Sequence, residues 1–147
     1  MFAIPFFVSV RLIKPEGRLP AASETPGFIR EEAIATAASW TGVARTAPGA
    51  MSAWHHHGDW ETVAYVVTGA VRLESGALGQ DVVVGEPGDV IHIPAHVVHR
   101  ESNPADVEQR LIVMRTGAGP IVTNVEAPST RPADSHAGGS NRQEHDA

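Results

Sequence analysis

Short apolar stretches separated by glycine and proline dominate the middle of the chain. Residues 62–68 are rich in β-branched and aromatic side chains and end at Gly69, which is typical of a strand followed by a turn. No long stretch shows the period of an amphipathic helix, so the pattern predicts an all-β fold, a sandwich or a barrel. Further predicted strands are residues 8–13, 41–47, 70–74, 80–84, 90–93, 99–102, 108–115 and 121–125.

Composition narrows the class of protein. The 147 residues are enough for one domain with a sizeable core. The net charge of −6 comes with scattered Lys and Arg, so we expect no nucleic-acid partner. Because the chain has no cysteine, disulfides and thiol catalysis are excluded, and a metal would need His, carboxylate or water ligands.

The two ends differ from the middle. Residues 1–10 are apolar but lack a preceding basic region, and they are far shorter than the roughly 20 residues that span a bilayer. We therefore expect no membrane partner, a cytoplasmic location, and a first strand at residues 8–13 that pairs with a second subunit. A start codon assigned too far upstream is the alternative. The expected divisions are an N-terminal arm (1–40), a barrel (41–125) and a disordered tail (126–147).

Three consecutive histidines, His55, His56 and His57, come just before the strand at residues 62–68. In an extended segment alternate side chains point to the same face. His55 and His57 therefore share a face, where two imidazoles could bind one transition metal. A third ligand is expected elsewhere in the chain, since two rarely hold a metal well.

The surrounding residues resemble the first motif of the cupin superfamily. The matching positions are Gly49, His55, His57, Glu61 and Gly69.

A second stretch is similar to the second cupin motif and supplies the third histidine. Its matching positions are Gly88, Pro94, His99 and Asn103, and His96 stands where the pattern has Gly. The resemblance implies a cupin double-stranded β-helix, a jelly-roll-like antiparallel barrel of the small single-domain type. It also implies one divalent ion (Fe, Mn, Zn, Ni or Cu) on His55, His57 and His99, and exchange of arms between subunits of a homodimer. Residues 28–39 are rich in Ala and Glu and could form a helical turn, although a cupin more often has a strand or an irregular segment there.

The sequence does not decide whether Glu61 is a fourth ligand of this metal site. Counted forward from His57 it fits the family's Glu, whereas counted backward from Gly69 the Glu position is held by Thr62. A one-residue shift on a strand turns the side chain to the other face. A bulge near Gly58 or Asp59 could bring Glu61 inward.

Other residues near the motifs are candidates for the pocket around the metal. His92 could be a fourth ligand, an acid or base, or a packed histidine; His56 is expected to face outward, and His96 to lie near the rim. Trp60 and Tyr65 could line the pocket or form the barrel wall, and Asn103 could support His99. An inward-facing arginine could bind a substrate carboxylate in a two-pronged contact. The candidates for that role are Arg45, Arg72, Arg100 and Arg115.

Function is predicted only in outline, because the fold alone does not settle it. The resemblance implies a metal-dependent enzyme of the dioxygenase, isomerase, decarboxylase or cyclase type that acts on a small organic molecule; no catalytic residue is identified. The alternative is a non-catalytic cupin that binds or senses a small molecule.

The apolar N-terminus generates a first prediction. Light scattering at micromolar concentration should give the mass of a homodimer, because residues 6–12 would add to a neighbour's sheet edge. Deleting residues 1–7 should shift the mass toward the monomer. A monomeric full-length chain would contradict the dimer. A truncated chain that remains dimeric would show that residues 1–7 do not form the dimer contact.

Overall fold

The computed structural model describes residues 9–129 and confirms the all-β class, with one short 3₁₀ helix, η1 (Pro15–Gly17), and no α-helix in that range. None of the described helices is long and apolar enough to cross a membrane. The strands are β1 (Leu19–Ala21), β2 (Phe28–Ala35), β3 (Ser39–Thr46), β4 (His55–His56), β5 (Glu61–Thr68), β6 (Val71–Ser75), β7 (Asp81–Gly85), β8 (Val90–Ile93), β9 (Arg100–Ser102), β10 (Gln109–Thr116) and β11 (Thr123–Asn124).

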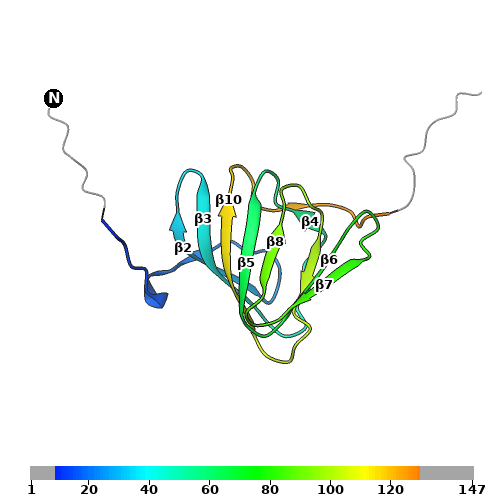
Figure 1. Cartoon of the computed structure of the whole chain (residues 1–147), viewed down its shortest axis with the longest axis horizontal. Helices are drawn as coiled ribbons and strands as arrows, with labels where there is room; N and C mark the ends of the chain where they lie inside the picture. The colour runs from blue at the N-terminus through cyan, green and yellow to red at the C-terminus, as the bar shows by residue number, and fades with distance from the viewer. Residues whose placement is uncertain (1–8, 130–147) are drawn as a thin grey trace, which may run out of the picture.

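The strands form two main antiparallel sheets that enclose the core (Figure 1). The larger sheet has the order β1-β2-β3-β10-β5-β8, the smaller one has the order β7-β6-β9, and β11 pairs with β4. In the larger sheet β3, β10, β5 and β8 are neighbours although they are far apart in sequence, as in a jelly roll. The double-stranded β-helix is therefore confirmed.

Apolar side chains from both sheets meet between them. Ala64 and Val66 of β5 belong to the same buried cluster as Val71 and Leu73 of β6. Strands with one face in the core and one in water bury alternate residues, and β10 follows this rule with Gln109, Leu111, Val113 and Arg115 buried. The alternation also places the polar residues Thr62 and Arg115 on the inner face.

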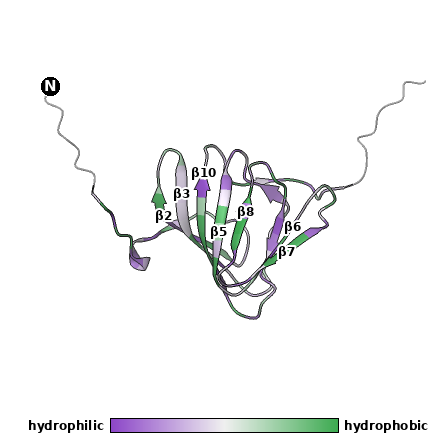
Figure 2. Cartoon of the chain, in the orientation of Figure 1, coloured by the Kyte–Doolittle hydropathy of each residue, from purple (hydrophilic) through white to green (hydrophobic). Residues whose placement is uncertain are grey.

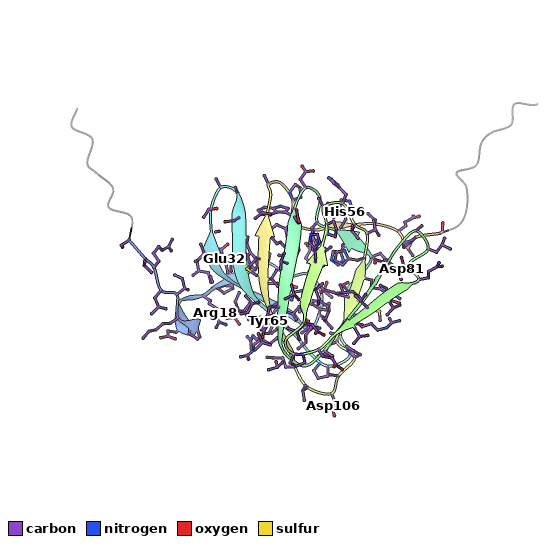
Figure 3. The ribbon with its side chains drawn as sticks, viewed as in Figure 1. Arg18, Glu32, His56, Tyr65, Asp81 and Asp106 are labelled. Carbon is purple, nitrogen blue, oxygen red and sulfur yellow. The ribbon has the colours of Figure 1, made fainter. Side chains whose placement is uncertain are left out.

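The outer surface keeps apolar residues. β7 and β8 are coloured largely hydrophobic in Figure 2, yet Val83 of β7 and Val90 of β8 are 58% and 67% exposed. Tyr65 is 43% exposed on the outer face of β5 (Figure 3). Of the two alternatives for Tyr65, this position favours the barrel wall, and Tyr65 is not among the residues that line the cavity described below.

The N-terminal part differs from the predicted arm. Residues 9–13 form no strand and Val8 lies outside the described residues, so the predicted strand at 8–13 is not found there. Residues 28–35 form strand β2 rather than a helical turn, because backbone pairing with β3 overrides the helical preference of its Glu and Ala residues. The structure thus joins residues 19–35 to the larger sheet.

The remaining terminal predictions stay open. Residues 1–8 and 130–147 lie outside the described residues, and residues 126–129 have no regular structure. The apolar leader and its pairing with a second subunit therefore remain a prediction.

Asn103 stabilises the loop that follows β9 through three side-chain hydrogen bonds. Its side-chain amide donates to the carbonyls of Thr46 (3.0 Å) and Val107 (2.8 Å), and its Oδ1 accepts from the backbone N–H of Ala105 (2.9 Å). The side chain is 1% exposed. Asn103 thus stabilises a turn and is not among the residues that line the cavity described below.

Replacing Asn103 generates a stability prediction. Asn103→Ala should lower the free energy of unfolding by about 2 kcal/mol or more, because buried backbone groups lose their partners. Urea unfolding of the metal-free protein would measure it, with the exposed residue Asp106 of the same loop, changed to Ala, as the control. An equal midpoint for the two variants would contradict this role.

Candidate metal centre

Two chain segments, one from each predicted motif, are joined at the histidines. His55 begins β4 and His99 immediately precedes β9. The backbone N–H of each donates to the carbonyl of the other, both at 2.9 Å. This antiparallel bridge fixes the third histidine beside the first pair.

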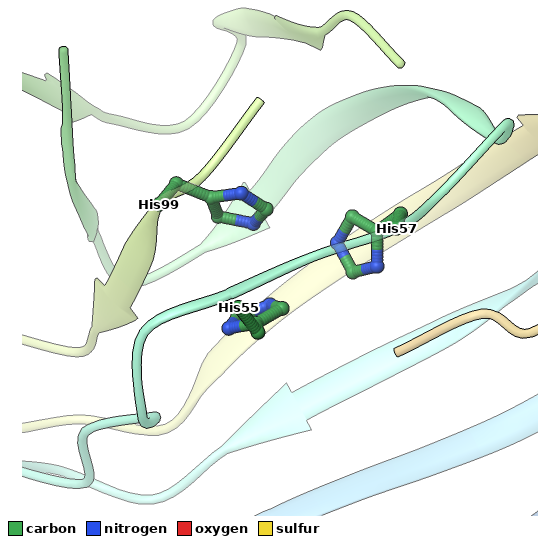
Figure 4. A group of neighbouring side chains, drawn as sticks. All are labelled: His55, His57 and His99. Carbon is green, nitrogen blue, oxygen red and sulfur yellow. The ribbon is translucent and has the colours of Figure 1, made fainter. Parts of the chain in front are cut away.

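The three predicted ligands His55, His57 and His99 converge in the interior (Figure 4). They are 4%, 4% and 2% exposed. One ring nitrogen of each lies within 4.8 Å of those of the other two. The structure therefore brings together the histidines that the sequence selected, and they could bind a metal ion.

Hydrogen bonds orient the three rings. Each Nδ1 lies within hydrogen-bond distance of a backbone carbonyl: Ala53 for His55 (2.8 Å), Ile121 for His57 (2.6 Å) and Val97 for His99 (2.9 Å). A carbonyl only accepts, so each Nδ1 carries a proton, and in the neutral form of each ring the lone pair is on Nε2. Nε2 of His99 is buried without a hydrogen-bond partner among the described residues. This donor set fits a metal ion.

The surroundings keep two of these imidazoles neutral. Burial, helped by the positive charge of Arg115, lowers the pKa of His57 to about 3. Burial also lowers the pKa of His99, and a nearby positive charge on His55 would lower it further. Neutral imidazole is the form that binds metals.

Glu61 lies outside this cluster. Its side chain is 55% exposed, and its Oε1 is 2.6 Å from Nε2 of His92. The pairing of β5 with β10 is regular from Glu61 to Val66, so no bulge turns Glu61 inward, and Thr62 faces the interior at 3% exposure. The structure corrects the assignment of Glu61 as a ligand and favours the alternative that the sequence left open.

The other histidine candidates also lie away from the centre. His92 is exposed beside Glu61. His96 is exposed in a turn, with Nε2 2.8 Å from Oδ1 of Asp59, and its φ of 63° suits a position where the family has glycine. His56 is half-buried and accepts a hydrogen bond from the backbone N–H of Gly58.

Trp60 belongs to the barrel wall. Its ring is in the core cluster, and its indole N–H donates to the carbonyl of Gly119 (2.9 Å). Trp60 does not line the cavity beside the histidines.

A cavity of about 420 Å³ adjoins His55 and His57, a size typical of small-molecule sites. Its apolar wall includes Phe28, Trp40 and Ile121, and its charged residues are Glu24, Arg30, Glu101 and Arg115.

Sequence reasoning missed Arg30 and Glu101. They form an ion pair of 3.1 Å on the cavity wall. Burial alone raises the pKa of Glu101, but the positive charges around it, Arg30 first, outweigh burial and lower it. Because alternate residues of a strand share a face, counting two residues on from His99 could have identified Glu101. Arg30 lies in residues 28–39, where the sequence pattern predicted no strand.

Of the arginine candidates, only Arg115 faces the cavity. Arg72 and Arg100 both pair with Glu74, at 2.9 and 2.7 Å, and Arg45 pairs with Glu31 at 2.8 Å. None of these three lines the cavity.

Comparison with known proteins agrees with this architecture. The family model of the cupin domain matches residues 42–115. The chain belongs to the cupin family. No curated protein matches the sequence of this cupin significantly.

Solved structures similar to this cupin come from several bacteria. KdgF from Halomonas sp. has 21% identity and a TM-score of 0.62, over 74% of this chain and 96% of that one. The polyketide cyclase RemF from Streptomyces resistomycificus has 19% identity and a TM-score of 0.67, over 80% and 87%. An S161A mutant of the oxalate decarboxylase OxdC from Bacillus subtilis has 20% identity and a TM-score of 0.61, over 73% and 30%. At these identities the likeness shows a shared fold.

The position of Glu61 generates a prediction. Glu61→Gln should leave the metal content of this cupin unchanged, because the carboxylate is exposed and paired with His92. Metal analysis after purification would measure it, with His99→Ala as the control that loses metal. A loss of about tenfold or more in metal affinity for Glu61→Gln would return it to the ligand set.

Proposed function

We propose that this cupin is a metal-dependent enzyme that acts on a small organic molecule, with one divalent transition-metal ion on His55, His57 and His99. The observation that carries the proposal is the convergence of three buried imidazoles, each with Nδ1 bound to a carbonyl, beside a cavity of about 420 Å³. Imidazole ligands suit Fe, Mn, Zn, Ni or Cu.

Three protein ligands leave coordination positions open for water or substrate. A bound ion would polarise a carbonyl or enol, or activate water or dioxygen. The ligand set contains no carboxylate, so the histidines would leave the charge of the ion undiminished.

The chain's own residues would bind and orient the substrate. Phe28, Trp40 and Ile121 offer an apolar wall, and Glu101 offers a carboxylate two residues from His99 on the same strand face. The ion pair with Arg30 holds Glu101 in place, where it could accept a proton from a bound substrate.

Two of the similar structures, the polyketide cyclase and the oxalate decarboxylase, are enzymes, which supports the enzyme class over a binding or sensing protein. The reaction type remains open among dioxygenase, isomerase, decarboxylase and cyclase.

Metal content tests the centre itself. The purified protein should hold close to one transition-metal ion per chain, and the double variant His57→Ala, His99→Ala should lose most of it. The double variant His92→Ala, His96→Ala is a matched control, because it removes two exposed histidines. Stoichiometric metal in the first double variant would refute the assignment.

The reaction class requires a separate screen. The iron-loaded protein would be tested for oxygen uptake with small enols, diols and keto acids. Substrate loss with oxygen uptake would identify an oxygenase, and loss without it a redox-neutral enzyme. Tight binding of one compound without turnover under any metal would favour the non-catalytic alternative.

A further inference from the structure

Arg115 is a buried cation beside the three histidines. It lies near the end of β10, is 8% exposed and lines the same cavity as His57. Its Nε donates to Oγ1 of Thr62 at 3.3 Å, and its guanidinium carbon is 5.3 Å from the centroid of a Trp40 ring. A Cβ at Gly42 would collide with the Trp40 ring, so glycine at this position leaves room for the ring. These contacts fix the orientation of the guanidinium group through its Nε atom and its planar face.

The charge of Arg115 lacks a partner within the part of the chain that the structure describes. Its Nε bond to Thr62 is the one side-chain hydrogen bond it makes there, and no carboxylate lies within 4.0 Å. In residues 9–129 the other strand-borne arginines each have a glutamate partner: Arg30, Arg45, Arg72, Arg100 and Arg110. Arg115 is the exception, and Nη1 and Nη2 are left for a ligand.

The rest of the cavity offsets this charge only in part, through the negative charge of Glu101. Glu101 is already paired with Arg30, and Glu24 is exposed. Burial lowers the pKa of Arg115 to about 10, so the side chain remains charged at neutral pH. A buried charge without a partner is costly, and an anion bound in the cavity would relieve that cost.

We infer that the substrate is an organic acid, and that Arg115 binds its carboxylate through Nη1 and Nη2 while the apolar part lies against Phe28, Trp40 and Ile121. The inference rests on the proposed function, since it names the substrate class of that same site. The planar guanidinium matches a carboxylate in a two-pronged contact. One unpaired arginine matches one negative charge, whereas a phosphate dianion would require more donors. Arg115 is thus a specificity-determining residue.

A pair of isosteric probes tests the inference. Calorimetry on the full chain loaded with Co²⁺ would compare benzoylformate with its neutral amide. The wild type should bind the acid about tenfold or more tightly, since hydrogen bonds between charged groups contribute at least that factor. Arg115→Gln should reduce this preference by about tenfold, so that only the part due to the charge of the cobalt ion is left, while the cobalt content and the affinity for the amide stay unchanged. Arg110→Gln is the matched control, because Arg110 is an exposed residue of the same strand paired with Glu108.

Several outcomes would overturn the inference. Equal binding of acid and amide by the wild type, or a preference in Arg115→Gln as large as in the wild type, would do so even if cobalt is stoichiometric. Tighter binding of inorganic phosphate than of benzoate would overturn the assignment to carboxylate. If Arg115→Gln does not fold, Arg115→Lys replaces it. Lysine keeps the positive charge but lacks the two parallel donors of the guanidinium. An unchanged preference for the acid in this variant would refute the two-pronged contact.

Failure of the metal centre is a separate result. If the protein takes up no cobalt, the proposed function fails, and benzoate and benzamide are compared on the metal-free chain. A preference for benzoate that depends on Arg115 would support the anion site without the metal. No preference would overturn the anion site as well.

Discussion

The backbone bridge between His55 and His99 is the contact on which the candidate metal centre depends. Its two hydrogen bonds of 2.9 Å join segments more than forty residues apart in the chain. The bridge places His99 beside His55, and the carbonyls of Ala53, Ile121 and Val97 then set the tautomer of each ring. The carbonyl of Ile121 follows β10, so the orientation of His57 requires a third segment of the chain. The centre therefore exists only once both sheets and the segment after β10 are in place.

The period of two along each strand decides which other side chains share the interior. On β5 it turns Thr62 inward and Glu61 toward His92. On β10 it turns Arg115 inward beside the apolar Val113. At β9 the same rule places Glu101 two residues beyond His99 and next to Arg30. The polar residues of the cavity are thus interior positions of strands whose other inward residues form the core.

The sequence was sufficient for the fold and for the three histidines, because the motif spacings and the alternation of strand residues are local. It was not sufficient for β2, whose Glu- and Ala-rich sequence resembles a helix and becomes a strand only by pairing with β3. Glu61 could not be decided either, since its direction depends on where β5 has an irregularity. That irregularity lies beyond Val66, opposite the step between Arg110 and Leu111. Asn103, expected to support His99, instead binds backbone groups at the end of β3 and in its own loop, which requires knowledge of the tertiary fold.

One position links the ligand set of the metal centre to the charge of the cavity. Oγ1 of Thr62 is 3.3 Å from Nε of Arg115. A glutamate turned inward at this place would lie within reach of the guanidinium, and the two charges would form a buried ion pair. It would also bring a carboxylate into the interior of the barrel that holds the histidines. With threonine there, the hydroxyl satisfies Nε without adding charge, the interior gains no carboxylate, and the positive charge of Arg115 stays available. The one-residue register of β5 therefore determines both the all-histidine donor set and the electrostatic preference of the cavity for an anion.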